Sequence, residues 1–330
     1  MSDLRVALVG CGGSGTFYHA PAWFDIEGAS LIAVCDIVEE KAKRIGEKYG
    51  AKVYTDLDRM LKVEKPDVLD VATKPPEHAP CVIKGLEAGC HVYCETPLAT
   101  SSDEGKEMVK AAEKNGRFLG YNDNYRFAPH QSMLKKWIES GELGTPCLIV
   151  STGHPWTYHH RVDLMLFFGG EISEVYAPKA DPLPEEDGGG TRCTISTLKF
   201  ESGMLGSLIG GGQSRNPEGG WVVFWPWHYG MQIIDYTGTN GRVVTYDIIG
   251  GLERYDREQR LIYKWEPTVG ERRDFPYTWR LAIGAFAEAI MKEREPPVTG
   301  VDGVKSLLIL EAIRESMEKN IPVKPKPYSP

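Results

Sequence analysis

The first 120 or so residues alternate short apolar runs with segments whose apolar positions follow a helical period. Strands are predicted where the apolar runs occur, at residues 5–9, 30–35, 68–72, 91–94 and 117–121. Helices are predicted between them, at residues 14–24, 38–49, 76–88 and 101–114. Strands that alternate with helices in this way favour a parallel sheet covered by helices on both faces.

The pattern changes after residue 125. One more helix is predicted at residues 127–140, and β-rich segments then follow at residues 145–151, 191–200, 204–209, 221–225, 231–236 and 242–246. Two late helices, at 278–292 and 301–319, precede a Pro-rich tail. The sequence therefore predicts an α/β fold with a doubly wound parallel sheet over residues 1–123. An α+β domain with a mostly antiparallel sheet is predicted over residues 124–330.

Length and composition support two domains of an ordinary globular protein. The chain has 330 residues, 42% of them apolar and 25% charged, and lacks an apolar stretch of the roughly 18 residues that a membrane span needs. The net charge is −8, and the positive and negative residues are interspersed along the chain. The sequence therefore indicates no basic surface for a nucleic-acid partner. The N-terminal residues run directly into a predicted strand and show no features of an export signal, so we expect a cytoplasmic protein. The chain has seven cysteines, an odd number, and we expect them to be free thiols.

A metal site is not expected. Cys90, His91 and Cys94 lie close together, but an alternating strand would turn His91 and the cysteines to different faces. No second pair of ligands follows them.

A Gly-rich turn follows the first predicted strand and opens the first predicted helix. Its sequence, Gly10-Cys11-Gly12-Gly13-Ser14-Gly15, fits G-x-G-x-x-G, and Asp36 stands at the end of the next strand. Such a turn lets backbone N–H groups meet a pyrophosphate, and the acidic residue accepts hydrogen bonds from the adenosine ribose. The carboxylate would repel a 2′-phosphate, and Ile37 and Val38 follow instead of Arg or Ser, so NAD is favoured over NADP.

Further motifs occur in the order seen in one large family. They are Val71-Ala72-Thr73 with His78, Glu95-Thr96-Pro97, Tyr125-Arg126-Phe127 with Pro129, Ser140-Gly141-Glu142-Leu143-Gly144, and His160-Arg161-Val162-Asp163. Over nearly its whole length the chain resembles the glucose-fructose oxidoreductase and inositol dehydrogenase family, written Gfo/Idh/MocA. The resemblance implies a Rossmann domain, a second domain whose open sheet often builds a homodimer or homotetramer, and hydride transfer involving a sugar or cyclitol carbon.

Two positions depart from the family pattern. The middle residue of the first catalytic motif, normally Lys, is Thr96, and an Asp normally found four residues before the His is replaced by Trp156. A lysine beside the reacting carbon would stabilise a developing alkoxide, whereas threonine carries no charge. His160 then becomes the main candidate for proton transfer, with Tyr158 and His159 as neighbouring donors or acceptors.

The remaining candidate residues are assigned to cofactor or substrate. Glu95 is expected near the nicotinamide ribose, with a solvated strand-end carboxylate as the alternative; Thr96-Pro97 is a candidate cis peptide by resemblance. Arg126 is expected to position cofactor or substrate unless it forms a surface salt bridge, and Asp163 to support the helix or the substrate. The other cofactor candidates are Thr73, His78, Pro97 and Asn122, and Trp156 and His159 are further substrate candidates.

Three functions remain open at this level. The first is an NAD-dependent oxidoreductase acting on a sugar, cyclitol or related polyhydroxylated small molecule. The second is an enzyme that oxidises a sugar transiently so that a glycosidic bond breaks by elimination, and the third is a cofactor-binding regulator without turnover. The aromatic cluster Trp221, Phe224, Trp225, Trp227, His228 and Tyr229 fits a sheet core or an oligomer interface, or else a stacking wall for a sugar.

Overall fold

A computed structural model of the chain describes residues 3–153, 158–178, 194–210, 213–215, 221–223, 233–246, 250–267 and 277–329. The chain divides into two compact units. The first contains residues 1–124, 276–307 and 328–330, and the second contains residues 125–275 and 308–327. Residues 276–307 were predicted to belong to the second domain, whereas in the structure the chain returns to the first unit over these residues.

The first unit is built on a six-stranded sheet. Its strands are β1 (Leu4–Val9), β2 (Ala29–Cys35), β3 (Lys52–Tyr54), β4 (Val68–Val71), β5 (His91–Cys94) and β6 (Leu119–Tyr121). All neighbours are parallel, in the order β3-β2-β1-β4-β5-β6. The order reverses between β1 and β4, which is the point where ligands bind in sheets of this kind.

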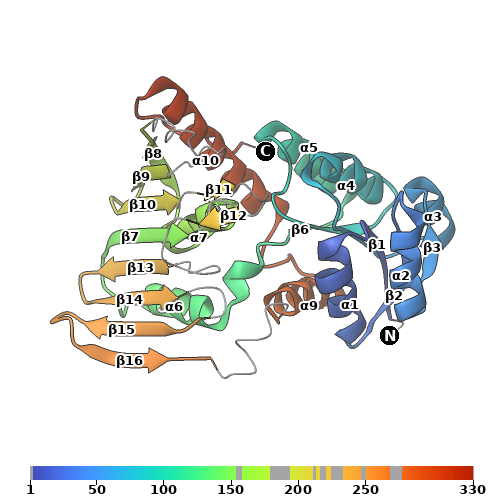
Figure 1. The fold of residues 1–330 in the computed structure, drawn as a ribbon, viewed down its shortest axis with the longest axis horizontal. Helices are drawn as coiled ribbons and strands as arrows, with labels where there is room; N and C mark the ends of the chain where they lie inside the picture. Colours follow the sequence, from blue (N-terminus) through green and yellow to red (C-terminus); the bar gives the residue numbers. More distant parts are fainter. Residues whose placement is uncertain are drawn as a thin grey trace. The chain divides into compact units, whose positions relative to one another are not determined.

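Helices cover both faces of this sheet. They are α1 (Ala20–Asp25), α2 (Glu39–Tyr49), α3 (Leu57–Glu64), α4 (His78–Glu87), α5 (Ser102–Asn115) and α9 (Tyr277–Met291). Helices α4 and α5 pack together on one side, and α1 packs against α9 on the other (Figure 1). Trp23 of α1 and Phe286 of α9 are both buried in the same apolar core as β1.

Two short elements of this unit escaped the sequence analysis, and one helix begins in an unexpected way. Strand β3 and helix α3 have only three and eight residues, too few for their periodicity to be recognised. The predicted helix at 14–24 begins with a π-helical segment, Gly15–His19, before α1. Such segments are uncommon and often occur at functional sites.

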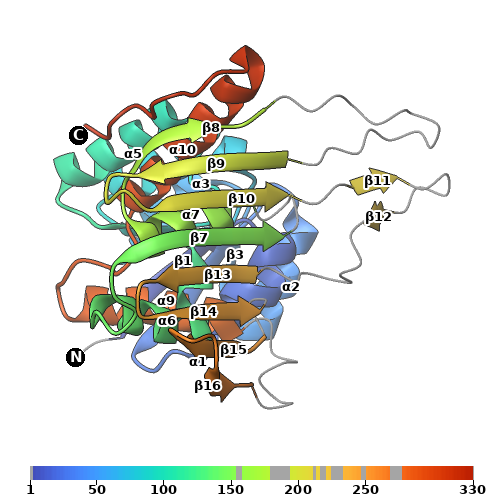
Figure 2. The same cartoon turned by 90° about the vertical axis from the view of Figure 1, so that its left-hand side faces the viewer.

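The second unit contains an eight-stranded sheet in the order β16-β15-β14-β13-β7-β10-β9-β8 (Figure 2). Its strands are β7 (Pro146–Gly153), β8 (Ile172–Tyr176), β9 (Thr194–Phe200), β10 (Leu205–Gly210), β13 (Ile233–Gly238), β14 (Gly241–Tyr246), β15 (Leu252–Asp256) and β16 (Leu261–Trp265). Only the β7–β10 pair is parallel, so the prediction of a mostly antiparallel sheet is confirmed.

One face of this sheet is covered by α6 (Pro129–Glu139), α7 (Tyr158–Gly169) and the second part of α10 (Gly300–Lys319). Along β9, buried residues such as Leu198 alternate with exposed ones such as Ile195, as expected for a sheet covered on one side. The strand predicted at 221–225 does not belong to the eight-stranded sheet. The corresponding strand β12 (Trp221–Val223) pairs with β11 (Gln213–Arg215) in a separate two-stranded sheet.

Candidate active site

The Gly-rich turn of the first unit has a backbone that only glycine fits at two positions. Gly10 has a φ of +96°, and a Cβ atom there would lie 2.5 Å from the carbonyl carbon of Ala72. A Cβ atom on Gly15 would overlap the carbonyl oxygen of Gly10. At Gly12 and Gly13, by contrast, an added Cβ would meet nothing within 4 Å. The turn is therefore packed on one side and open at the two central glycines.

Asp36 joins this turn to the end of β2. One carboxylate oxygen accepts a hydrogen bond from the backbone N–H of Cys11 at 2.8 Å, and the other accepts from Val38 N–H at 2.8 Å. Each oxygen keeps a further lone pair, so the carboxylate can accept hydrogen bonds from the two hydroxyls of a ribose. The open glycines and the held carboxylate fit a dinucleotide, with its pyrophosphate at Gly12 and Gly13 and its adenosine ribose at Asp36.

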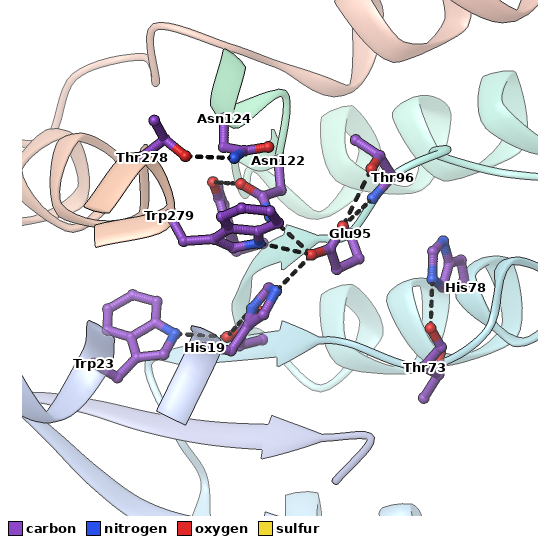
Figure 3. Close-up of polar contacts among 12 residues, drawn as sticks. His19, Trp23, Thr73, His78, Glu95, Thr96, Asn122, Asn124, Thr278 and Trp279 are labelled. Carbon is purple, nitrogen blue, oxygen red and sulfur yellow. Dashed lines mark hydrogen bonds and ion pairs between the residues drawn. The ribbon is translucent and has the colours of Figure 1, made fainter. Parts of the chain in front are cut away.

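A network of buried polar groups includes residues of β4 and of the segment directly after β5 (Figure 3). Glu95, 7% exposed, follows β5; one of its oxygens accepts hydrogen bonds from His19 Nε2 at 2.9 Å and Trp279 Nε1 at 3.0 Å. The same oxygen accepts from Asn122 Nδ2 at 3.0 Å. The other oxygen accepts from the backbone N–H of Thr96 at 2.6 Å and from its hydroxyl at 3.2 Å. Glu95 is thus a buried, fully hydrogen-bonded carboxylate, and the alternative of a solvated strand end is wrong.

His19 links this carboxylate to a second one. Its Nδ1 lies 2.8 Å from an oxygen of Asp70, which also accepts a hydrogen bond from Trp23 Nε1 at 2.7 Å. Burial alone would lower the pKa of His19, but the charges and hydrogen bonds of Asp70 and Glu95 raise it to about 10. Burial would likewise raise the pKa of Glu95, yet the hydrogen bond and charge of His19 hold it well below its usual range. His19 and Glu95 are therefore both ionised near neutral pH.

The predicted cis peptide is present at Thr96-Pro97. His78, which is fully buried, lies beside this turn, with Nδ1 3.0 Å from the carbonyl oxygen of Pro97 and Nε2 3.2 Å from that of Thr73. His78 thereby ties the loop after β5 to the loop after β4. The Thr73 hydroxyl oxygen is buried and has no hydrogen-bond partner in the described part of the chain, as expected for a group that a ligand completes.

Asn122 and Asn124 are turned into the interior of the unit. The Asn122 amide donates to Glu95 and accepts from the Tyr93 hydroxyl at 2.8 Å, and the Asn124 amide donates to Thr278 Oγ1 at 2.7 Å. The direct contact of Asn122 with the cofactor remains a prediction, since this side chain serves the network around Glu95.

In the second unit, His160 lies in the first turn of α7 and is 7% exposed. Its ring stacks on Tyr125, with centroids 3.9 Å apart and planes within 8° of parallel. The ring of His159 lies 4.3 Å from it, at 37°. The orientation of His160 is thus fixed by stacking.

Tyr158 and Arg161 flank this histidine pair. The Tyr158 hydroxyl lies 2.9 Å from Ser196 Oγ, and burial raises the pKa of Tyr158, so the phenol stays protonated at neutral pH. Arg161 is fully buried, rests on the Tyr158 ring, and donates from Nη1 to the carbonyl oxygen of Ile209 at 2.6 Å. Its Nε and Nη2 have no hydrogen-bond partner among the described residues, and burial lowers the pKa of the guanidinium to about 10.

Arg126 and Asp163 form a two-pronged ion pair within the second unit. Arg126 Nε and Nη2 each donate to one oxygen of Asp163, at 2.5 Å in both cases. The side chains are 9% and 0% exposed, so this pair is buried rather than a surface salt bridge. It joins the segment before α6 to the first turns of α7, on the face that carries His160 one turn earlier.

Some predicted residues lie outside the part of the chain that the structure describes. They are Trp156 and, in the aromatic cluster, Phe224, Trp225, Trp227, His228 and Tyr229. Among the described residues, no group of His, Cys, Asp or Glu side chains is arranged to hold a metal ion, and no helix is both long and apolar enough to cross a membrane.

Four residues of these networks were not predicted from the sequence: His19, Asp70, Trp279 and Arg161. Asp70 carried a signal, since a carboxylate inside an apolar strand must find partners. His19 lies one helical turn beyond the Gly-rich turn, and Arg161 lies inside a quoted motif. Trp279 is 184 residues from Glu95, and nothing local pointed to that contact.

Both the N-terminal and the C-terminal part of the chain resemble known proteins. The profile of an oxidoreductase family with an NAD-binding Rossmann fold matches residues 4–122, and that of the C-terminal α/β domain of the same family matches residues 124–324. A myo-inositol 2-dehydrogenase of Thermotoga maritima is 27% identical over 97% of this chain and 98% of its own. A D-glucoside 3-dehydrogenase of Escherichia coli is 38% identical over 43% of this chain and 41% of its own, so the match spans under half of that relative.

A levoglucosan dehydrogenase structure in complex with NADH and levoglucosan has the same fold, with a TM-score of 0.84 at 20% identity over 99% of this chain and 100% of that one. The two family profiles together cover nearly all of the chain. The chain therefore belongs to the Gfo/Idh/MocA family of oxidoreductases, whose first domain is an NAD-binding Rossmann fold.

Proposed function

We propose that the chain is an NAD-dependent oxidoreductase that transfers a hydride between nicotinamide and a carbon of a sugar, cyclitol or related polyhydroxylated compound. The names of relatives support this substrate class, since they act on myo-inositol and D-glucosides. The observation that carries the proposal is the fixed orientation of His160 on Tyr125, in a chain whose other unit has the glycine turn and Asp36.

His160 is the proposed proton-transfer group. When bound, the nicotinamide accepts or returns the hydride, and a base must take the hydroxyl proton of the substrate as the alcohol is oxidised. Histidine suits this task near neutral pH. Thr96 supplies a neutral hydrogen-bonding group where the family normally has lysine, and Tyr158 stays protonated and serves as a donor.

A panel of aldoses, glycosides and cyclitols tests this proposal by the absorbance of NADH. The wild type is expected to reduce NAD⁺ with at least one member, and His160→Ala to lose about 10²-fold or more in kcat/KM. Melting temperature and NADH affinity of the variant control for its fold. Release of an aglycone without net NADH would indicate transient oxidation instead. NADH binding without turnover on any member would indicate a regulator.

The preference for NAD over NADP rests on Asp36. Its carboxylate is held by Cys11 and Val38 backbone N–H groups, and Ile37, 92% exposed, offers no charge to a phosphate. Fluorescence titration is expected to show NADH binding at least tenfold tighter than NADPH, and Asp36→Ser to reduce that ratio. An equal affinity of the wild type for both cofactors would contradict this assignment.

We also propose that the chain forms a homodimer or homotetramer through the face of the eight-stranded sheet opposite α6 and α7. Leu148, Ile195 and Leu205 are 42%, 53% and 54% exposed and lie on neighbouring strands β7, β9 and β10. Light scattering of the wild type and of Leu205→Lys tests this, because a charge in a buried interface would shift the protein to smaller species. A wild-type monomer would contradict it.

A reducing compartment such as the cytoplasm fits the cysteines. Six of them are in the described residues and none forms a disulfide there. Burial raises the pKa of Cys11 and Cys35 to about 12, so these thiols stay protonated.

A further inference from the structure

One histidine and two acidic side chains form a buried cluster in the first unit: His19, Asp70 and Glu95. His19 and Asp70 are 0% exposed, and Glu95 is 7% exposed. The His19 ring lies between the two carboxylates, with Nδ1 2.8 Å from Asp70. Its Nε2 lies 2.9 Å from Glu95 (Figure 3). The charges and hydrogen bonds of Asp70 and Glu95 raise the pKa of His19 to about 10, so at neutral pH both ring nitrogens carry a proton and the ring is an imidazolium.

The cluster carries a net charge of −1, from one cation and two anions. The other groups that donate to the carboxylates are neutral: Trp23 to Asp70, and Asn122, Thr96 and Trp279 to Glu95. Among the described residues, therefore, His19 is the only cation in hydrogen-bond contact with the two carboxylates. A buried charge of this kind is weakly screened and acts over several ångströms.

The position of the cluster follows from the sheet order. Asp36, the proposed ribose ligand, follows β2 on one side of the switch between β1 and β4, whereas Asp70 and Glu95 belong to β4 and to the end of β5 on the other side. A dinucleotide bound at such a switch places its two nucleotide halves over the two halves of the sheet. The cluster therefore belongs to the nicotinamide half.

We infer that the His19–Asp70–Glu95 cluster sets the redox balance of the bound cofactor, by stabilising the cationic oxidised nicotinamide over the neutral reduced one. The inference rests on the proposed function. Its consequence is that NAD⁺ is held more tightly, relative to NADH, than a neutral site would hold it, and that bound NADH is a stronger hydride donor. Asp70 and His19 act through their charge and through Glu95, without touching the substrate.

The test measures the ratio of Kd for NAD⁺ to Kd for NADH, using NADH fluorescence and displacement by NAD⁺. Asp70→Asn makes the cluster neutral while keeping an acceptor for His19, and the ratio is expected to rise about three- to tenfold. Glu64→Gln is the matched control. Glu64 is also a buried carboxylate of this unit, 4% exposed, but it pairs with Lys52 and Tyr54 instead of the cluster. Its ratio is expected to stay at the wild-type value.

A second pair of variants covers the case in which Asp70→Asn does not fold. Thr96 is only partly buried and contacts Glu95, so Thr96→Lys adds a positive charge beside the cluster, and Thr96→Gln adds similar length without charge. The ratio is expected to rise in Thr96→Lys and to stay unchanged in Thr96→Gln. Folded Asp70→Asn and Thr96→Lys proteins with the wild-type ratio would overturn the inference and leave the proposed function standing. A wild type that binds neither nucleotide would overturn the proposed function itself.

Discussion

His19 makes the stability of the folded chain depend on pH in an unusual direction. Its pKa is raised from an ordinary 6.5 to about 10, so at pH 7 to 9 the folded chain binds a proton that the unfolded chain lacks. The stabilisation by the imidazolium is complete below pH 6.5 and is lost as the pH rises through the folded pKa. It is therefore greatest on the acidic side of this window.

Urea unfolding at pH 7, 8 and 9 checks this contribution. The free energy of unfolding is expected to fall with rising pH, by at most about 1.4 kcal/mol per pH unit from this group, and the fall should be smaller in His19→Gln. Identical pH dependence in the two proteins would show that His19 is not charged in the fold.

Arg161 is a second residue whose charge has a consequence for stability. Burial of its guanidinium is unfavourable, and no carboxylate is paired with it in the described part of the chain. We expect Arg161→Met to keep or raise the melting temperature and to lower kcat/KM at least tenfold, because a positive charge next to His160 can stabilise a substrate alkoxide. A variant with a much lower melting temperature and unchanged kcat/KM would contradict both expectations.

Site residues that lie close together in the sequence could be predicted, whereas partners far apart in the sequence could not. The glycines and Asp36 lie within one βαβ unit and could be predicted, because strand, turn and acidic residue follow one another at fixed spacing. The hydrogen-bond partners of Glu95 could not be predicted in this way. His19 and Trp279 are 76 and 184 residues away, and only the fold brings them to one carboxylate.

Among the elements, the Gly-rich turn contains one glycine that we expect to matter for cofactor binding and another that we expect to matter for stability. Gly12→Ala adds a Cβ that meets nothing within 4 Å, whereas Gly15→Ala adds one that overlaps Gly10. We expect Gly12→Ala to change the melting temperature by less than about 2 °C and to weaken NADH binding at least tenfold, since the methyl group occupies the space proposed for the pyrophosphate. Gly15→Ala is expected to lower the melting temperature by about 5 °C or more. Unchanged NADH affinity in Gly12→Ala would place the pyrophosphate elsewhere.

Elements with a clear period were predicted, and those without one were missed. Helix α2 carries charges on one side and apolar residues on the other, and its structure at Glu39–Tyr49 agrees with the prediction of 38–49. Strands β15 and β16 were missed because they form a hairpin at the sheet edge, where β16 is exposed at four of five positions. A strand with no buried face shows no alternation of apolar and polar residues.

At the scale of the whole molecule, the chain order did not predict which unit α9 joins. A helix was predicted at 278–292, but the sequence pattern could not show which domain it packs against. In the structure Ile283, Phe286 and Ala287 pack in the core of the first unit, and the Phe286 ring lies 4.9 Å from that of Tyr93. Helix periodicity reveals burial, whereas the partner depends on tertiary packing.

We propose that this chain performs hydride transfer although the resemblance to its family leads us to expect lysine at the position of Thr96. Mass spectrometry of the cofactor tests it most directly, after incubation of the chain with NAD⁺ and a panel of aldoses, glycosides and cyclitols deuterated at their carbon-bound positions. We expect NADH that carries one deuterium with at least one panel member, and we expect this labelled NADH to be lost in His160→Ala. Cofactor free of deuterium across the whole panel, from a protein that binds NADH, would contradict it.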